Sequence, residues 1–365
     1  MILILHAGCK QADKQKQIQS IDIKENNPFV LVFAGDVMHH HIPQLSAAYD
    51  VETQKIDYKP CFQYIKSYIE TADIAFCNLE FPLAGKPYSG YPSFSGPDEM
   101  LDALQWSGFD IFQLANNHII DKGYIGLDRT IDEIKNRDLE YVGAYGNSNK
   151  KNEKYPLIIN KNNVRFAILN YTYNTNKANS GSSVVNKLDT ASIIRDIRKA
   201  KMKSADIIIA TVHWGTEYQL SSDEYQQKWA DFFVRYGADL IIGSHPHVVQ
   251  NAEIKEYKTK KVPVFYSLGN FISNQRKANR NGGILARVEI DVDKKIIKNV
   301  SYLPFYVLKG ILRGKYQFYL LPTDEFLRYP SLYPISNKSD STNLIGFHRQ
   351  TQKTLQNISS YLEVE

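Results

Sequence analysis

The sequence predicts an α/β fold with a second, more antiparallel layer of strands, and three observations carry this prediction. Short, continuous apolar runs recur along the chain, as is typical of strands that are covered on both faces. Segments with helical spacing of apolar residues lie between these runs. A later segment alternates apolar and charged residues, which indicates a strand with one face in water.

The apolar runs end abruptly at polar residues of the types that bind metals. The six runs are 29–34, 74–77, 109–115, 207–212, 240–242 and 264–268. They lead into Gly35-Asp36, Asn78-Leu79-Glu80, Asn116-Asn117-His118, His213, Gly243-Ser244-His245-Pro246-His247 and Gly269-Asn270-Phe271. In an open α/β sheet, ligands bind beyond the carboxyl ends of the strands. We therefore expect all six clusters to gather along one edge of the sheet.

Helical spacing is clearest in the segments 98–106, 190–202 and 223–236. In the last segment the residues of one helical face are Tyr225, Trp229, Phe232, Phe233 and Tyr236. Gly237 then supplies a natural helix stop. The segment 174–186 is rich in Asn and Ser, which predicts a long loop beside the sheet edge.

The antiparallel layer is expected near residue 290. Residues 286–292 alternate between apolar and charged side chains. The turn-like Asp293-Lys294-Lys295 would join this strand to a partner at 296–302 as a hairpin.

The start of the sequence predicts an exported lipoprotein. An apolar run and two small residues directly precede Cys9, as at the end of a bacterial lipoprotein signal, so Cys9 would be the acylated anchor. The polar stretch from Lys10 to Asn27 would be a tether, too hydrophilic to pack. The alternative is a cytoplasmic protein with an accidental apolar start. Cys61 and Cys77 show no paired spacing and are expected in the core.

Size and charge limit the remaining possibilities. The chain has 365 residues and 43% hydrophobic content, enough to bury a substantial core in one large domain or two smaller ones. No later segment has the roughly 20 apolar residues of a membrane helix, so we expect a soluble body. The net charge of +5 is spread along the chain, which disfavours a nucleic-acid phosphodiesterase.

The polar clusters contain a set of candidate metal ligands. These are Asp36, Glu80, Asn117, His213, His245 and His247. Neutral imidazoles and carboxylates with an open position suit a divalent metal in a hydrolase, and six ligands suffice for a pair of metals. Taken singly, Asp36 could be a helix cap, Asn117 a turn residue and His213 a core histidine. The close pair His245 and His247 is the strongest single indication.

These motifs together resemble the CapA capsule-synthesis family. They are Gly35-Asp36-Val37-Met38, Asn78-Leu79-Glu80, Ala115-Asn116-Asn117-His118 with Asp121-Lys122-Gly123, His213-Trp214-Gly215-Thr216-Glu217-Tyr218, Gly243-Ser244-His245-Pro246-His247-Val248 and Ser267-Leu268-Gly269-Asn270-Phe271. The family in turn resembles calcineurin-like metallophosphatases. The resemblance implies a two-layer mixed β-sandwich flanked by helices, with the layers α/β/β/α. We expect a tether in 1–28, this domain in 29–292 and a C-terminal extension packed on it in 293–365.

The resemblance also implies roles for single residues. Asp36, Asn117, His213, His245 and His247 would bind metal. His118 would either act as an acid that protonates the leaving group or stabilise the transition state.

The sequence departs from the phosphatase pattern in two places. Met38 stands where those enzymes have a histidine, and His40 is our candidate to replace it, although the run His39 to His41 could simply cap a helix or face solvent. Glu80 stands where they place a metal-bridging aspartate. Glu217 and Asn270 are expected to orient ligands or substrate.

The resemblance predicts a surface-anchored metallohydrolase with one or two zinc, manganese or iron ions. Its substrate would be a phosphoester or an anionic polymer such as capsular poly-γ-glutamate, and its partners membrane-bound proteins of polymer synthesis or export. The alternative is a non-catalytic component of such a complex, in which the metal loop binds polymer or only holds the fold.

Overall fold

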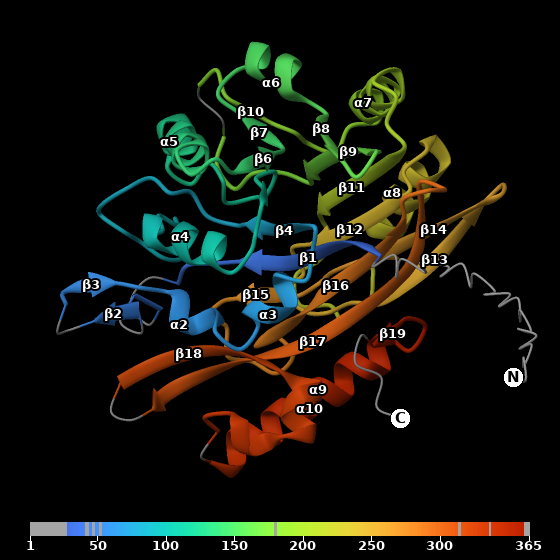
Figure 1. Ribbon diagram of the computed structural model, residues 1–365. Helices are drawn as coiled ribbons and strands as arrows, with labels where there is room; N and C mark the ends of the chain where they lie inside the picture. The colour runs from blue at the N-terminus through green and yellow to red at the C-terminus, as the bar shows by residue number, and fades with distance from the viewer. Residues whose placement is uncertain are drawn as a thin grey trace, which may run out of the picture.

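The computed structural model describes residues 28–40, 44–45, 48–50, 53–178, 181–312, 315–335 and 337–360. Cys9, His41 and the predicted tether before Pro28 lie outside these residues. Two sheets, with nine and six strands, carry the fold, and helices flank them (Figure 1). This arrangement confirms the predicted class, a mixed α/β sandwich.

The nine-stranded sheet has the order β18-β17-β16-β1-β4-β5-β6, with β15 paired to β1 and β19 paired to β17. Its strands are β1 (Phe29–Val37), β4 (Ile74–Leu79), β5 (Ile111–Gln113), β6 (Glu140–Val142), β15 (Asn270–Ile272), β16 (Gly282–Asp291), β17 (Ile296–Leu312), β18 (Lys315–Pro322) and β19 (Ser359–Ser360). Strands β1, β4, β5 and β6 are parallel, whereas β16, β17 and β18 add antiparallel to the other side of β1.

The six-stranded sheet has the order β13-β14-β12-β11-β9-β8. Its strands are β8 (Leu157–Lys161), β9 (Val164–Thr172), β11 (Ile207–His213), β12 (Leu240–Ser244), β13 (Ala252–Tyr257) and β14 (Lys260–Phe265). The four inner strands are parallel, and β8 and β13 close the edges as antiparallel partners. Two small ribbons pair β10 (Val184–Val185) with β7 (Ala144–Tyr145) and β2 (Tyr49–Asp50) with β3 (Lys55–Ile56).

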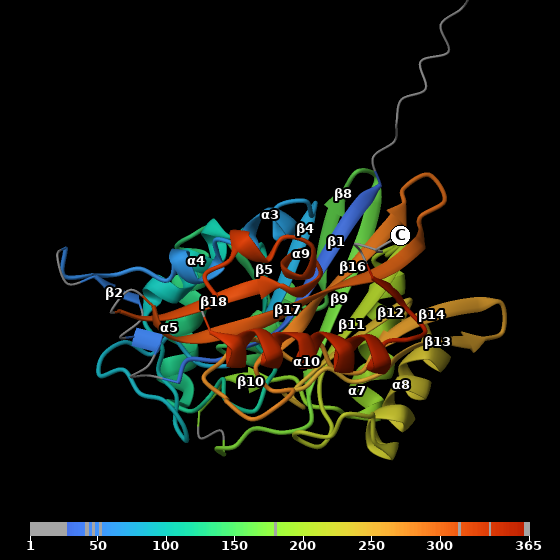
Figure 2. The same cartoon turned by 90° about the horizontal axis from the view of Figure 1, so that it is seen from below.

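The helices lie outside the two sheets. They are α2 (Lys59–Phe62), α3 (Lys66–Ile69), α4 (Asp98–Trp106), α5 (Gly123–Lys135), α6 (Ser148–Lys154), α7 (Thr190–Met202), α8 (Glu224–Tyr236), α9 (Thr323–Arg328), the 3₁₀ turn η1 (Pro330–Leu332) and α10 (Lys338–Thr354). Figure 1 shows α7 and α8 beside the six-stranded sheet, and Figure 2 shows α10 running along β17. None of the described helices is both long and apolar enough to cross a bilayer.

Helix α8 illustrates how the sequence sets the helix ends. Asp223 and Gln226 form a capping box, which satisfies two free N–H groups of the first turn. Gly237 ends the helix at a φ of 120°, in the left-handed region that glycine adopts most easily. Phe233 and Ala230 on the inner face are fully buried. The three helices predicted from periodicity are all present.

The predicted placement of the antiparallel strands was wrong. The hairpin of 286–292 with 296–302 forms as expected, but β16 pairs directly with β1, Phe29 lying opposite Ile290. It therefore extends the sheet of β1 instead of forming the other layer. The second layer is built from β8 to β14, so the six polar clusters are divided between the two sheets. The alternation of apolar and charged side chains in 286–292 indicates that one face of the strand is exposed to water. It does not indicate which strand pairs with it.

The two sheets meet where the chain passes from β14 to β15. Leu268 N donates to Gly243 O at 3.2 Å in one sheet, and Asp36 N donates to Gly269 O at 3.0 Å in the other. The approach is so close that a Cβ at Gly35 would lie 2.0 Å from Gly269 O, so only glycine fits there. This contact brings the end of β1 against the end of β12.

The loop predicted at 174–186 contains the short strand β10, which pairs with β7. The residues after 292 contribute β17 and β18 to the nine-stranded sheet and α10 against β17. Cys61 and Cys77 are both buried.

Candidate metal centre

Five predicted ligands converge at the meeting point of the two sheets. Three groups of ligand atoms each lie within 4.8 Å: Glu80 with His213 and His245, Asp36 with Glu80 and His247, and Glu217 with His245 and His247. Glu80 belongs to two of these groups, as a bridging carboxylate would. All members except Glu217 are buried. Glu217, expected to orient ligands or substrate, lies within ligand distance of both histidines of the loop.

The surroundings of Glu80 suit a cation. Its side chain is 0% exposed, and neither carboxylate oxygen has a hydrogen-bond partner among the described residues. Burial, and the neighbouring Asp36, raise the pKa of the Glu80 carboxyl well above its usual value. A buried carboxyl without partners is costly, and a bound metal ion would compensate it. The donor set therefore fits a divalent metal.

His213 lies at the end of β11 with its ring nitrogens facing different groups. Its Nε2 lies 2.9 Å from Asn117 Oδ1 and 3.5 Å from Glu80 Oε1. Its Nδ1 lies 3.1 Å from Ser244 Oγ and 3.2 Å from Asn78 Nδ2. Ser244 Oγ can accept from Nδ1–H, and this tautomer leaves the Nε2 lone pair facing the other candidate ligands.

Burial favours the neutral form of His213 and His245, which is the form that binds metals. Burial, followed by the neighbouring His245 and His247, lowers the pKa of His213 well below its usual value. Burial, and then His247, lower the pKa of His245 to about 3. His245 Nδ1 has no hydrogen-bond partner among the described residues.

His247 is held between the two sheets. Its Nδ1 lies 3.0 Å from Asp36 Oδ2 and 3.1 Å from Asn270 Oδ1, and its Nε2 lies 3.8 Å from Glu80 Oε1. Asp36 in turn accepts hydrogen bonds from Asn78 Nδ2 at 2.8 Å and from the His245 backbone N at 3.2 Å. The predicted positioning residue Asn270 therefore contacts a candidate ligand directly.

The loop that carries the two histidines has an uncommon backbone. His245 has a φ of 98° and His247 a φ of 57°, and Tyr218 on the adjacent loop has a φ of 70°. Such values cost non-glycine residues roughly 1–3 kcal/mol each and concentrate at functional sites. Tyr218 N donates to Pro246 O at 2.8 Å, which ties the two loops together. The strained turn directs both imidazoles toward the same carboxylates.

His118 lies beside the ligand groups and belongs to none of them. Its Nδ1 lies 2.8 Å from Asp121 Oδ2, so the ring donates to that carboxylate, and Nε2 lies 3.3 Å from the Asn176 amide. Asn116 holds the turn by accepting from His118 N at 3.1 Å and donating to Leu79 O at 2.8 Å. This arrangement fixes an imidazole next to the candidate metal centre without using it as a ligand.

His40 also lies outside the three ligand groups. Its Nδ1 accepts from Asn274 N at 3.2 Å, and its ring packs edge-on against Phe94. Burial, followed by His247 and Lys309, lowers its pKa to about 3. Its role as a ligand stays a prediction.

Lys309 on β17 approaches the centre from the side of His40. Its ammonium donates to Gln275 O. Burial, and then Arg276, lower its pKa from 10.5 to about 7. The native state therefore binds fewer protons than the unfolded state between pH 7 and pH 10.5. Lys309 consequently lowers the free energy of unfolding below pH 7, and this loss is recovered as the pH rises toward 10.5.

We therefore expect Lys309→Met to raise the free energy of unfolding at pH 6 by on the order of 1–3 kcal/mol, and by less at pH 9. Denaturant unfolding at both pH values measures this difference. The exposed Lys298 on the same strand provides the control Lys298→Met, which should change neither value. An equal effect of Lys309→Met at both pH values would contradict the expectation.

Several residues of the centre were missed in the sequence. Asn78, Ser244 and Asn176 contact candidate site residues, and the Tyr173 ring centre lies 4.7 Å from that of His245. Tyr173 and Asn176 follow β9, a seventh apolar run that the sequence reading did not single out. The residues of β9, followed directly by Tyr173, were the signal from which this part of the centre could have been predicted.

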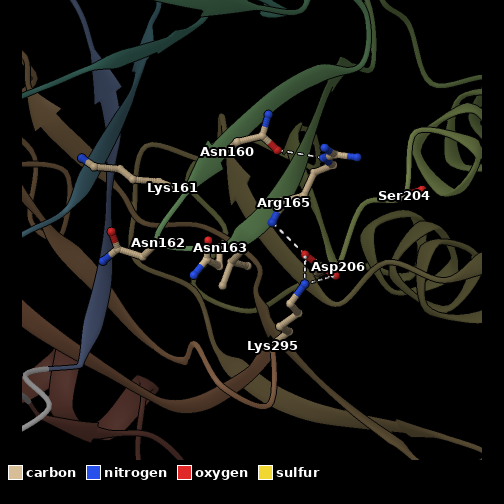
Figure 3. Close-up of a pocket in the computed structure, with 9 residues that line it drawn as sticks. Asn160, Lys161, Asn162, Asn163, Arg165, Ser204, Asp206 and Lys295 are labelled. Carbon is tan, nitrogen blue, oxygen red and sulfur yellow. Dashed lines mark hydrogen bonds and ion pairs between the residues drawn. The ribbon is translucent and has the colours of Figure 1, made fainter.

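A separate hollow of about 740 Å³ lies at the turns between β8 and β9 and between β16 and β17 (Figure 3). Its cations are already engaged, because Lys295 pairs with Asp206 at 3.1 Å and Arg165 Nε donates to Asn160 at 2.8 Å. The hollow lies where β9 and β11 begin, whereas the candidate ligands lie at the carboxyl ends of their strands. The ligand groups therefore lie elsewhere.

The fold and the site define a class: a two-sheet α/β protein whose buried histidines and carboxylates are able to hold metal ions. The chain belongs to the bacterial capsule synthesis protein family PGA_cap, whose model matches residues 30–275. This confirms the resemblance drawn from the motifs.

Two relatives carry related names. The capsule biosynthesis protein CapA of Bacillus anthracis is 29% identical over 288 residues, which cover 75% of this chain and 67% of the relative. The PGA biosynthesis protein CapA of Bacillus subtilis (strain 168) is 31% identical over 252 residues, covering 67% of this chain and 63% of the relative. About a third of each relative thus lies outside the match.

Solved structures show more distant similarity. A hypothetical protein from Thermus thermophilus has a TM-score of 0.44 at 13% identity, covering 76% of this chain and 99% of that protein. The 5'-nucleotidase from Candida albicans has a TM-score of 0.39 at 11% identity, covering 90% of this chain and 58% of that protein.

Proposed function

We propose that the protein is a metal-dependent hydrolase of capsule or poly-γ-glutamate biosynthesis that acts on a phosphoester or an anionic polymer. The observation that carries the proposal is the buried carboxylate of Glu80, which has no hydrogen bond among the described residues and lies within ligand distance of His213, His245, His247 and Asp36. The order of the motifs and the names of the CapA relatives support the biological setting.

One or two zinc, manganese or iron ions would supply Lewis-acid stabilisation of the developing charge and activate water. The described residues supply the rest of the chemistry. Asp36, Glu80, Asn117, His213, His245 and His247 would hold the ions, with Glu217 available from the exposed side.

His118 would donate a proton from Nε2 to the leaving oxygen. To act as the acid, the ring would carry protons on both nitrogens, with Nδ1–H donated to Asp121 Oδ2 at 2.8 Å and Nε2–H facing the site. The ring of Phe94 packs against His118 with centres 4.6 Å apart and restricts its rotation.

The setting of the reaction rests on the sequence. An exported protein anchored through an acylated Cys9 would meet a capsular polymer and its membrane-bound synthesis or export proteins at the cell surface. Labelling with a radioactive fatty acid, compared between wild type and Cys9→Ala, tests the anchor, and equal labelling of both would contradict it.

A non-catalytic role is the competing candidate, and one observation favours it. Nearly all the candidate ligands are buried, so a metal could hold the two sheets together without meeting substrate. In that case the protein would bind polymer as part of a synthesis complex.

Elemental analysis and phosphoester turnover separate these candidates. We expect protein purified without chelator to contain metal and to hydrolyse p-nitrophenyl phosphate or its bis ester. Removal of the metal should abolish turnover, and adding zinc, manganese or iron should restore it. Retained metal without turnover of either ester would support the non-catalytic role, and protein without metal would contradict both readings of the centre.

A further inference from the structure

Arg280 places a guanidinium group beside the candidate metal centre. It lies in the loop between β15 and β16, and its side chain is partly exposed. The guanidinium carbon is 3.2 Å from the centre of the Tyr218 ring. Tyr218 follows Glu217, a candidate ligand, and its ring centre lies 6.0 Å from that of His247.

Two sets of hydrogen bonds tie this pair to the metal loop. Arg280 O accepts from Asn270 Nδ2 at 2.8 Å, and Asn270 Oδ1 lies 3.1 Å from His247 Nδ1. Tyr218 N donates to Pro246 O, between the two histidines. The backbone of Arg280 is therefore linked through Asn270 to His247, and the backbone of Tyr218 is bonded to the residue between the two histidines.

The charge of Arg280 is not neutralised within the part of the chain that the structure describes. No ion pair joins it to an acidic side chain there, whereas Arg129 pairs with Asp98 at 2.7 Å and Arg137 with Asp102 at 2.6 Å. Stacking on the face of Tyr218 leaves the in-plane N–H donors of the guanidinium available. Those donors match two oxygens of a phosphate or carboxylate.

Arg276 lies on the same loop as Arg280 and is exposed, with its guanidinium carbon 5.9 Å from the Tyr316 ring centre. Lys309 donates to Gln275 O, and Gln275 Oε1 accepts from Asn270 at 3.2 Å. The loop between β15 and β16 thus carries an exposed guanidinium besides the partly exposed one of Arg280.

We propose that Arg280, stacked on Tyr218, binds an anionic oxygen pair of the substrate, phosphate or carboxylate, and so selects polyanionic substrates at this centre. The proposal rests on the proposed function for its substrate, and its own content is the recognition of negative charge. A substrate with a second anionic group near the reacting bond would gain from Arg280, and a neutral analogue would not.

Calorimetric binding of two probes tests this inference without requiring turnover. The probes are inorganic phosphate and poly-γ-glutamate, and the proteins are metal-loaded wild type, Arg280→Met and Arg280→Lys. Arg198 on α7 is exposed and provides the matched control Arg198→Met. Metal content and thermal unfolding establish that each variant is folded and loaded.

We expect Arg280→Met to weaken binding of at least one probe by about 10–100-fold, because a charge-assisted, bidentate contact is lost. Loss with phosphate alone assigns the subsite to phosphoryl groups, and loss with the polymer alone assigns it to carboxylates. Arg198→Met should bind like wild type. If Arg280→Met does not fold, Arg280→Lys carries the test, with an expected loss of several-fold since lysine lacks the planar fork.

Unchanged affinity of the Arg280 variants for both probes would overturn the inference, and so would a wild type that binds neither probe. If wild type fails to hydrolyse phosphoesters while Arg280→Met still loses anion binding, the hydrolase proposal fails and the anion subsite stands.

Discussion

Replacing His118 with asparagine is expected to lower phosphoester turnover by about 10²–10⁴-fold while the metal content stays at the wild-type level. The imidazole is the proposed proton donor, and it lies outside the three ligand groups. Asparagine keeps a polar side chain near Asp121 but cannot transfer the proton. Turnover of p-nitrophenyl phosphate and elemental analysis of the same preparation measure both effects.

A second buried histidine serves as the control for this prediction. His348 on α10 lies 3.5 Å from Asp324 and 3.0 Å from Thr323, away from the candidate ligands. His348→Asn should therefore lose stability without losing turnover per folded molecule. Loss of metal from the His118 variant would show that the imidazole is a ligand, and full turnover would exclude it as the acid.

Replacing Glu80 with glutamine is expected to weaken metal binding but to stabilise the metal-free protein. In the presence of metal, loss of the bridging charge should weaken binding by at least about 100-fold, because substitutions of residues that only support ligands already cost 10–100-fold. After chelation, the variant should be more stable than wild type by on the order of 1–3 kcal/mol, since it removes a buried carboxyl that has no hydrogen bond among the described residues.

The metal-free proteins should also differ in their response to pH. Burial and Asp36 raise the pKa of Glu80 well above 4.5, so the native state binds more protons than the unfolded state above that value. Stability of chelated wild type should fall as the pH rises above about 4.5 toward the raised pKa, and the variant should lack this component.

Metal titration and denaturant unfolding with and without chelator measure these effects. Glu99 on α4 also has a carboxylate oxygen without a hydrogen bond among the described residues, so Glu99→Gln is the matched control. It should leave metal affinity unchanged. A Glu80→Gln protein that binds metal as tightly as wild type would remove Glu80 from the ligand set.

The local patterns were sufficient to predict most of the elements. Continuous apolar runs identified strands such as β1 and β11, because strands covered on both faces consist largely of apolar residues. The helical face ending at Gly237 identified α8, since periodicity and a stop signal agree there. Polar residues at the strand ends then led to Asp36, Glu80 and His247, which the structure brings together.

The arrangement of the sheets was not available from such patterns. The pairing of β16 with β1 depends on contacts between residues about 250 positions apart, and an alternating strand carries no mark of its neighbour. The same limit explains Tyr173, whose approach to His245 depends on how β9 packs beside β11. His40 shows that nearness in sequence is not sufficient either. It is close in sequence to Asp36, but its ring accepts a hydrogen bond from Asn274.

The close contact between Gly35 and Gly269 would determine when the protein could acquire the proposed ion during biosynthesis. Asp36 leaves the ribosome 211 residues before His247, and the contact that joins their strands needs residues that are made later still. A nascent chain therefore carries Asp36 and Glu80 without their histidine partners for most of its synthesis. Capture of the proposed metal would therefore come late in maturation, after the second sheet has closed against the first.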